Sequence, residues 1–303
     1  MGQSLLKVVR RLSARSVGTV AQQPVHALER WARGRDDYRK LRESDYVVVS
    51  VAKSGRTWLN VMISKYFQLR YNLPDYITFR FDNLHRQNPA VPKVILLHDT
   101  YIRIYTKCGD RKTPFYSTPT LLLIRHPADV AVSLYFHWRY RMQAPQKGLN
   151  RLPAHGAEVG VFDFVMRDTG LPSIVTFLNE WARERQHLAN CLTVRYEDLR
   201  ADPRAELGRV LRWMGQNPSD AEIDAVVEFA SFENLKKLEA KDAFGAKGSK
   251  GMTPGDVTNP DSFKVRRAKV GGYRDYFDDD QARQIEDYIR KNLDPSLGYA
   301  PAS

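Results

Sequence analysis

The sequence is poor in cysteine and has no long apolar run. Its 303 residues include two cysteines, Cys108 and Cys191, which are too few for a disulfide framework and lack the spacing of a zinc site. The apolar blocks at residues 94–97 and 121–124 have the length of strands, well short of the roughly 18 to 20 residues of a membrane-spanning helix. These absences predict a soluble or peripheral protein in a reducing compartment, the cytoplasm.

The sequence also lacks a linker rich in Pro, Gly or Ser that would divide it into domains. We therefore predict a single domain over residues 41–303. Residues 1–40 are predicted to be an N-terminal basic amphipathic extension, because apolar side chains recur at helical spacing among lysines and arginines (Leu5, Val8, Val9 and Leu12). The extension has no uninterrupted apolar core, which argues against a signal peptide, but its pattern is compatible with peripheral contact with a membrane.

Acidic residues are outnumbered by basic ones. The chain has 47 Lys and Arg against 35 Asp and Glu, a formal net charge of +12. Such an excess attracts polyanions, acidic lipid surfaces or an anionic small ligand. Charge alone does not choose among these partners.

Strand-like blocks alternate with helical patterns along the chain. Apolar blocks occur at residues 46–51, 94–97, 121–124 and 191–194. Helical patterns occur at residues 58–66, 129–140, 173–187, 203–213 and 220–238, the last with Asp220 as its cap. This alternation predicts an α/β fold with a central, mainly parallel β-sheet flanked by helices.

Polar residues follow the predicted strands at the points where the strands end. These residues are Lys53, His98, Arg125 and Tyr196. Because ligands of parallel sheets bind beyond the carboxyl ends of the strands, all four are expected around one crevice. Two stretches rich in Gly and Pro, residues 142–160 and 245–260, are predicted to be loops, and long loops beside a site often close over a ligand.

The segment after the first strand reads Lys53-Ser54-Gly55-Arg56-Thr57. A glycine at the start of a helix lets the backbone approach an anion closely, while free amide groups, the lysine and the threonine supply donors. This is not the nucleotide P-loop, in which the lysine follows the glycines instead of preceding them. The motif predicts a phosphate-binding loop and weakens the case for a kinase or an NTPase.

Four segments, taken together and in order, resemble those of the sulfotransferases that use 3′-phosphoadenosine-5′-phosphosulfate (PAPS). Residues 53–59, Lys-Ser-Gly-Arg-Thr-Trp-Leu, resemble the family's loop for the 5′-phosphosulfate. Residues 125–133 resemble its 3′-phosphate motif, with an arginine ending a strand and a serine eight residues later. Residues 195–203 match a further family signature, and residues 265–273 are similar to its C-terminal Phe-Arg-Lys-Gly motif.

The resemblance implies a P-loop-kinase-like α/β fold and a sulfuryl transfer from PAPS to a hydroxyl or amine, with 3′-phosphoadenosine 5′-phosphate (PAP) as product and no metal. Lys53 would hold the bridging oxygen of the donor, and His98 would take the proton of the acceptor as general base. The 5′-phosphate would be bound by Ser54, Gly55, Arg56 and Thr57. The 3′-phosphate would be bound by Arg125, Ser133, Arg266, Arg267 and the backbone at Ala268. The adenine would be surrounded by Trp58, Tyr196 and Phe232. His126 and His137 are interpreted as structural.

The chain departs from the family pattern at several positions, which suggests a branch outside the common cytosolic detoxifying enzymes. Arg56 replaces a threonine, Ala268 replaces a glycine, and Leu96 stands where many relatives have a lysine. The family's dimer segment is not recognisable, and the sequence predicts no oligomeric state. The expected acceptor is a small molecule, a carbohydrate or a lipid that enters from residues 76–92 and 142–160, and no nucleic-acid partner is expected.

Two other functions remain open at this point. A nucleotide kinase would share the fold and would transfer a phosphoryl group from ATP. A basic peripheral protein would bind anionic lipid or nucleic acid without chemistry, and its binding would survive the loss of Lys53 and His98.

Overall fold

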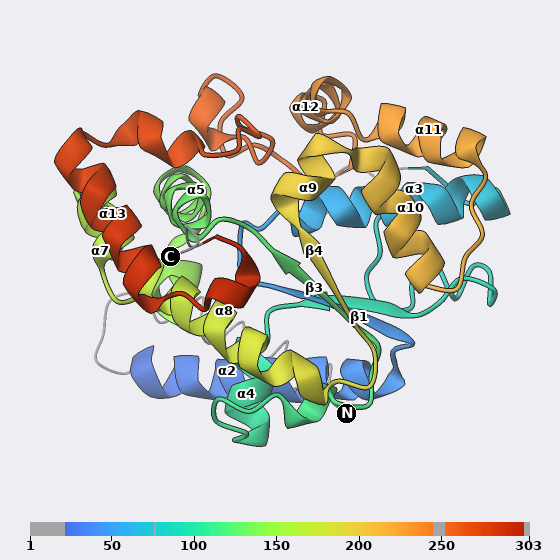
Figure 1. The fold of residues 1–303 in the computed structure, drawn as a ribbon, viewed down its shortest axis with the longest axis horizontal. Coiled ribbons are helices and arrows are strands. Elements are labelled where there is room, and N and C mark those ends of the chain that lie inside the picture. Colours follow the sequence, from blue (N-terminus) through green and yellow to red (C-terminus); the bar gives the residue numbers. More distant parts are fainter. Residues whose placement is uncertain (1–21, 76, 245–251, 300–303) are drawn as a thin grey trace.

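Four parallel strands form the central sheet in the computed structural model, which describes residues 22–75, 77–244 and 252–299 (Figure 1). The strands are β1 (Tyr46–Ser50), β2 (Val94–Leu97), β3 (Thr120–Ile124) and β4 (Cys191–Arg195). They are arranged in the order β2-β1-β3-β4, and Val48 of β1 is in register with Leu96 and Leu121. The four predicted blocks thus all form strands of one parallel sheet.

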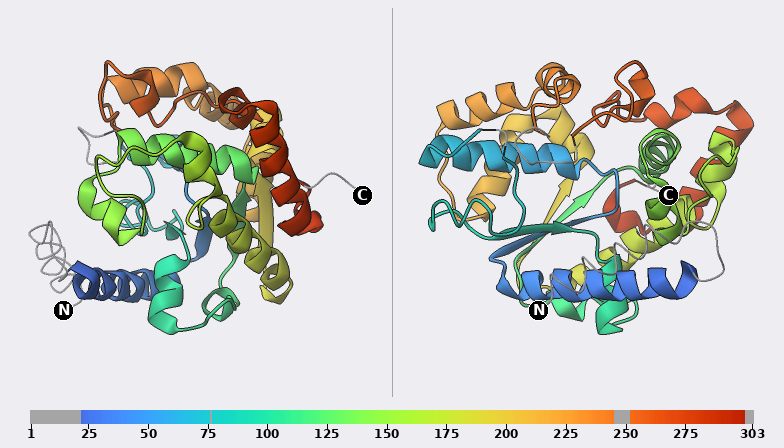
Figure 2. Two further views of the ribbon diagram at one scale, coloured as in Figure 1. Left: turned by 90° about the vertical axis from the view of Figure 1, so that its left-hand side faces the viewer. Right: turned by 180° about the vertical axis from the view of Figure 1, so that it is seen from behind.

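Helices cover both faces of this sheet (Figures 1 and 2). The helices are α2 (Gln22–Glu43), α3 (Arg56–Tyr71), α4 (Thr100–Thr106), α5 (Pro127–Tyr140), α6 (Ala144–Leu149), α7 (Val161–Met166), α8 (Leu171–Glu184), α9 (Tyr196–Ala201), α10 (Pro203–Trp213), α11 (Asp220–Phe229), α12 (Phe232–Ala240) and α13 (Asp279–Asn292). Short 3₁₀ helices occupy Thr113–Phe115, Arg185–His187, Pro260–Ser262, Gly272–Tyr276 and Pro295–Leu297.

Successive side chains of a strand point to opposite faces, so the sheet separates two apolar cores. Val47 and Val49 of β1 are buried in a core with residues of α4, α5 and α8. Val48 is buried in a second core with residues of α3, α10 and α11. Burial on both faces explains why the strands read as continuous apolar runs, and it confirms the predicted α/β class.

The order of the strands places a binding crevice beyond β1 and β3. The chain moves from β1 to β2 on one side and then crosses to β3 on the other side of β1. Crossovers that leave in opposite directions open a crevice at the carboxyl ends of the two strands. Lys53 follows β1 and Arg125 follows β3, so both residues lie at this edge.

Several predicted boundaries were wrong. The helix predicted over residues 220–238 is two helices, because Ser231 caps α12 by accepting a hydrogen bond from the amide of Asn234. Ser219, instead of Asp220, caps α11, and it exchanges hydrogen bonds with Glu222. The predicted loop at 142–160 contains α6, and α5 already begins at Pro127, a residue that favours the first helical turn.

Helix α2 packs along α4 (Figure 2), and its Leu41 is fully buried. The predicted boundary between extension and domain at residue 40 therefore falls inside a packed helix. The amphipathic residues from Leu5 to Leu12 lie outside the described residues, so their membrane contact stays a prediction. Among the helices that the structure describes, none is long and apolar enough to cross a membrane.

Candidate active site

A cavity of about 280 Å³ lies at the carboxyl ends of the strands. Lys53, His98, Arg125 and Tyr196 all line it, as the strand ends predict. It also brings together the other sequence-predicted residues, with the exception of Ser54: Gly55, Arg56, Thr57, Trp58, Ser133, Phe232, Arg266, Arg267 and Ala268. Ser54 is fully buried and does not line the cavity.

The loop between β1 and α3 forms one wall of the cavity. Lys53 and Gly55 both have positive φ, at 75° and 93°. A Cβ atom on Gly55 would lie 2.5 Å from Cδ2 of Tyr196, so both the backbone and the available space require glycine here. Helix α3 begins directly afterwards at Arg56, and the first amide groups of a helix have no partner within the helix. The wall is therefore suited to an anion.

Positive charge gathers around this wall. Burial, followed by repulsion from Lys264, Arg141 and Arg125, holds the pKa of Lys53 well below its usual value. Burial and the charge of Arg141 lower the pKa of Lys264 to about 7. Burial lowers the pKa of Arg56 to about 10. An anion in the cavity would relieve this repulsion.

Two arginines that line the cavity, and a third whose charge acts on Lys53 and Lys264, each have a buried nitrogen that lacks a hydrogen-bond partner among the described residues. The atoms are Nη1 of Arg56, Nε of Arg125 and Nη1 of Arg141. Buried polar groups in proteins are almost always hydrogen-bonded, and an unpaired one costs about 1–3 kcal/mol. The free donors of Arg56 and Arg125 make the cavity wall suitable for a ligand with anionic oxygens.

His98 directly follows β2 and makes two hydrogen bonds through its ring. Its Nδ1 lies 2.5 Å from the carbonyl oxygen of Ser50, and its Nε2 lies 3.0 Å from Nη2 of Arg56. A carbonyl only accepts and a guanidinium only donates, so the proton is on Nδ1 and the lone pair is on Nε2. Burial, and then the charge of Arg56, lowers the pKa of His98 to about 3. The ring is therefore neutral at pH 7.

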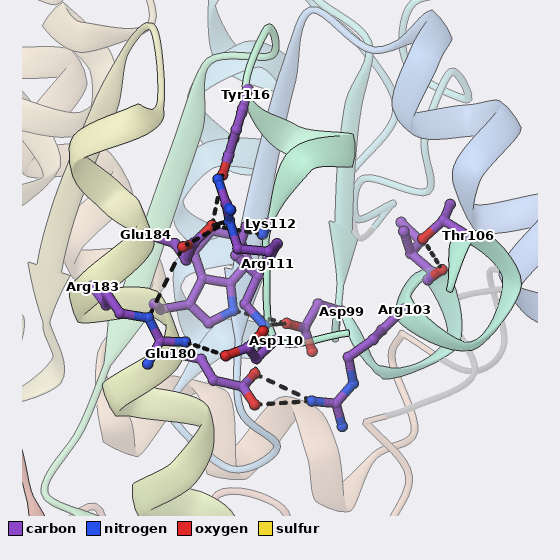
Figure 3. A network of polar contacts seen from close by, with 12 residues as sticks. Asp99, Arg103, Thr106, Asp110, Arg111, Lys112, Tyr116, Glu180, Arg183 and Glu184 are labelled. Atoms are coloured by element: carbon purple, nitrogen blue, oxygen red, sulfur yellow. Dashed lines mark hydrogen bonds and ion pairs between the residues drawn. The ribbon is translucent and has the colours of Figure 1, made fainter. Parts of the chain in front are cut away.

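The next residue, Asp99, anchors this turn in a buried polar network (Figure 3). Its carboxylate lies 2.8 Å from Nζ of Lys112 and accepts a hydrogen bond of 3.0 Å from Nε1 of Trp181. Lys112 also pairs with Glu180 at 2.6 Å. The side chains of Lys112 and Asp99 are almost fully buried, so the network fixes the backbone beside His98.

Arg125 and Ser133 line the cavity from β3 and α5. The Arg125 guanidinium stacks over the ring of Tyr196 at 4.2 Å and donates to the carbonyl oxygens of Lys53 and Lys269. These contacts connect the loop after β1 to the C-terminal segment through one side chain. A planar guanidinium held in this way suits a phosphate.

Aromatic side chains form another part of the wall. The rings of Trp58 and Tyr196 meet edge to face with their centroids 5.9 Å apart, and Nε1 of Trp58 donates to the carbonyl of Ala230. Phe232 at the start of α12 completes the group. The polar edge of Trp58 is already engaged, which leaves aromatic faces for a flat ring.

Two carboxylates hold the C-terminal segment of residues 264–273 over the cavity. Glu239, fully buried, accepts hydrogen bonds from the amides of Lys264 at 2.6 Å and Val265 at 2.8 Å. Asp129 accepts from the amides of Gly271 and Tyr273, both at 2.9 Å. The segment is thus fixed at both ends, on either side of its two arginines.

Arg266 and Arg267, between these fixed ends, already have partners. Arg266 pairs with Asp261 at 3.2 Å, and Arg267 pairs with Asp275. Both also donate to the hydroxyl of Tyr276. Ala268 has φ 51°, a left-handed conformation that favours glycine. The two arginines could bind an anion only by exchanging some of these contacts.

The sequence analysis missed several residues of the site. Lys264 precedes the C-terminal motif by one position, and His137, interpreted as structural, lines the cavity. Burial, and then Lys53, lowers the pKa of His137 to about 3. Glu239 carried no motif that could have revealed it. Within the described part of the chain, no group of three or more His, Cys, Asp and Glu side chains could hold a metal ion.

Comparison with known proteins shows which family this site belongs to. The family model of the sulfotransferase domain matches residues 111–296, more than half of the chain. Cytosolic sulfotransferase 16 of Arabidopsis thaliana is 26% identical over 279 residues, which cover 85% of this chain and 78% of that protein. Flavonol 4′-sulfotransferase of Flaveria chlorifolia is 25% identical over 271 residues, which cover 84% of this chain and 80% of that protein.

Solved structures have the same fold. Mouse sulfotransferase SULT7A1 complexed with PAP has a TM-score of 0.56 at 20% identity, covering 87% of this chain and 92% of its own. Retinol dehydratase in complex with androsterone and the inactive cofactor PAP has a TM-score of 0.55 at 18% identity, covering 89% and 87%. Together with the sequence matches, these similarities confirm that the chain belongs to the sulfotransferase domain family and is an enzyme that transfers a sulfuryl group.

Proposed function

We propose that the chain transfers the sulfuryl group of PAPS to a hydroxyl or amine of a small-molecule acceptor, with His98 as general base. The observation that carries this proposal is the cavity itself, in which Arg56 and Arg125 each keep a buried donor without a partner among the described residues. The two solved structures with the same fold, a mouse sulfotransferase and a retinol dehydratase, are both complexes with PAP. The donor set around the cavity fits such a polyanion.

The residues that line the cavity suit the two anionic ends of PAPS. Lys53 and the start of α3, from Arg56 to Trp58, would hold the 5′-phosphosulfate end. Arg125 and Ser133 would hold the 3′-phosphate, with Arg266, Arg267 and the backbone at Ala268 at the same end. The rings of Trp58, Tyr196 and Phe232 would surround the adenine. Ser54 and Gly55 would complete this phosphate-binding loop, with the side chain of Ser54 fully buried and outside the cavity lining.

The chemistry is an in-line transfer from a phosphate oxygen to the acceptor. A bond forms between the acceptor oxygen and sulfur as the bond from sulfur to the 5′-phosphate oxygen breaks, and that oxygen keeps the electron pair. Lys53 stabilises the negative charge that develops there. The acceptor proton goes to Nε2 of His98, the nitrogen that the hydrogen bond to Ser50 leaves with a lone pair.

Arg56 blocks this nitrogen in the structure. Its Nη2 donates to Nε2 of His98 at 3.0 Å. A guanidinium bonds more strongly to a phosphate oxyanion than to a neutral imidazole. Arg56 is therefore expected to release His98 once the donor site is filled, so that the base becomes available when the donor is present.

Two features bear on the compartment in which the protein acts. Both cysteines are free and half-buried, and curated relatives are named cytosolic, which supports a cytoplasmic location.

A nucleotide kinase would need no binding site for a 3′-phosphate. A protein that only binds polyanions would need no neutral imidazole beside the cations.

Calorimetric binding of PAP, with AMP and ATP as controls, tests the proposal without an acceptor. PAP is expected to bind at least tenfold more tightly than AMP, because the 3′-phosphate adds charge-assisted hydrogen bonds. The variant Arg125→Ala should lose most of this difference, whereas Arg290→Ala, at an exposed pair on α13, should keep it. Tighter binding of ATP than of PAP would overturn the proposal.

A further inference from the structure

A second cavity, of about 320 Å³, adjoins the first. The two share Arg56, Thr57, Met252 and Lys264 in their walls. The second cavity extends from this shared wall towards α2 and the segment around Phe79 to Phe81. Arg56 thus lies in the wall that the two cavities share, and its Nη2 is in hydrogen-bond contact with His98, the expected base.

The wall of the second cavity is rich in charge. Four cationic side chains, Lys40, Arg56, Arg80 and Lys264, line it together with one carboxylate, Asp37. Lys40 is neutralised by an ion pair with Asp36 at 2.6 Å. Arg80 is exposed at the rim, and its guanidinium makes no hydrogen bond or ion pair with the described residues. The cations therefore outnumber the acid even after this pairing.

Asp37 faces the same cations. Burial raises its pKa to about 6, against the lowering effects of Lys40, Arg33 and Arg56 and together with repulsion from Asp36. Asp37 is half-buried, and a ligand that covered it without a hydrogen bond would leave its carboxyl unpaired. The hydroxyl group of a ligand would supply this hydrogen bond.

An apolar acceptor would be disfavoured by this wall. It would displace water from Arg56 and Asp37 and leave their polar atoms unpaired, and Nη1 of Arg56 already lacks a partner among the described residues. Each buried polar group without a hydrogen bond weakens binding considerably. The wall also contains apolar side chains, among them Phe79, Phe81 and Ile95, so the molecule that fits offers oxygen atoms to the charged groups and an apolar face to the remainder.

From these contacts we propose that the acceptor is a small hydroxylated acid, whose carboxylate or phosphate lies against Arg80 and whose reactive hydroxyl reaches His98. The inference rests on the proposed function, because the second cavity is the acceptor site only if the first holds the donor. It sets this chain apart from relatives whose names specify flavonols and 3-beta-hydroxysteroids.

The test measures binding to the enzyme saturated with PAP, so it needs no turnover. At pH 7.5, calorimetry compares probes of one shape and different charge: 4-hydroxyphenylacetate, its amide, and tyramine. A second arm compares glucose 6-phosphate with glucose, which distinguishes a phosphate from a carboxylate. We expect at least one of the two acids to bind tenfold or more tightly than its neutral counterpart, and tyramine to bind most weakly of the three phenols.

Matched variants show whether the preference comes from this wall. Arg80→Gln should reduce the preference to threefold or less while PAP affinity is unchanged, since Arg80 does not line the first cavity. The control is Arg86→Gln, six residues after Arg80, where an exposed arginine pairs with Asp82. This variant should keep the preference. Equal binding of acids and neutral probes, stronger binding of tyramine, or no binding of any probe would overturn the inference. If PAP binds normally in that case, the proposed donor site stands; if PAP does not bind, both fail.

Discussion

Two clusters of buried charge meet at consecutive residues of this protein, His98 and Asp99, and they are built in opposite ways. Around Asp99 each acid has a basic partner: Lys112 pairs with Asp99 and Glu180, and Arg103 also pairs with Glu180 (Figure 3). Around His98 the cations Lys53, Arg56 and Lys264 repel one another or have lowered pKa values. Each acid of the first cluster has a basic partner in the chain, whereas the second cluster would be completed by the proposed ligand.

The difference teaches how buried charge can be interpreted. Desolvating a charge is costly, and a protein offsets that cost with a partner of opposite sign. Where the partner is part of the chain, the charges contribute to the fold. Where a buried donor has no hydrogen-bond partner among the described residues, as for Nη1 of Arg56 and Nε of Arg125, it points to the kind of ligand that the site would bind.

The largest expected effect follows from breaking the balanced cluster. Lys112→Met should lower the free energy of unfolding by about 3–5 kcal/mol, because it leaves Asp99 and Glu180 buried with less compensation. Urea titration measures the loss. Arg183→Gln, at a half-exposed pair with Asp110, is the control and should cost less than about 1 kcal/mol. Similar losses in the two variants would remove the distinction between the clusters.

Removing a cation from the cluster around His98 should lower the activity without lowering the stability. Lys53→Met should leave the stability unchanged or raise it, since repulsion from Lys264, Arg141 and Arg125 is relieved. The rate of PAP formation from PAPS should fall about 10²–10³-fold, as for the loss of one donor to a developing oxyanion. Urea titration and PAP release measure the two quantities, with Lys291→Met on α13 as control. A destabilised variant with normal turnover would contradict the comparison.

A smaller effect is expected at Glu239, a buried carboxylate that holds the backbone of the cationic residue Lys264. Glu239→Gln should weaken PAP binding about tenfold, because one of the amides of Lys264 and Val265 then faces an NH₂ group instead of an oxygen. Calorimetry measures the change, and the exposed Glu233→Gln on the same helix is the control. Tighter PAP binding would mean that removing the negative charge of Glu239 favours PAP more than the weakened hydrogen bonds to the amides disfavour it.

The smallest effect concerns the pH dependence of the base. Arg56→Thr removes a cation that, after burial, lowers the pKa of His98, so that pKa should rise from about 3. The base works when deprotonated, and the acid limb of kcat/KM should therefore move to higher pH. The ring nitrogen signals of His98 in NMR report the same shift without turnover. Arg70→Gln, which pairs with Glu222 farther along α3, should not shift them, and an unchanged pKa in Arg56→Thr would show that Arg56 has no hold on the base.

Much of the fold could be predicted from the sequence because its signals are local. The apolar runs of the four strands are short and uninterrupted, and each forms a strand of the sheet within one residue of its predicted ends. Where the signal was weak, the prediction failed: Ser219 and Ser231 act as caps only because their side chains meet particular backbone amides. An apolar periodicity cannot reveal such contacts.

The site likewise has a part that the sequence could predict and a part that it could not. The sequence by itself determined the residues at the strand ends, because a parallel sheet brings those ends to one edge whatever the remainder of the chain does. The tertiary structure alone decided that Arg56 would touch His98, that Glu239 would hold Lys264, and that Lys112 would find Glu180 68 residues away. The reason is physical: these contacts depend on side-chain directions and on desolvation, both of which exist only once distant segments pack together.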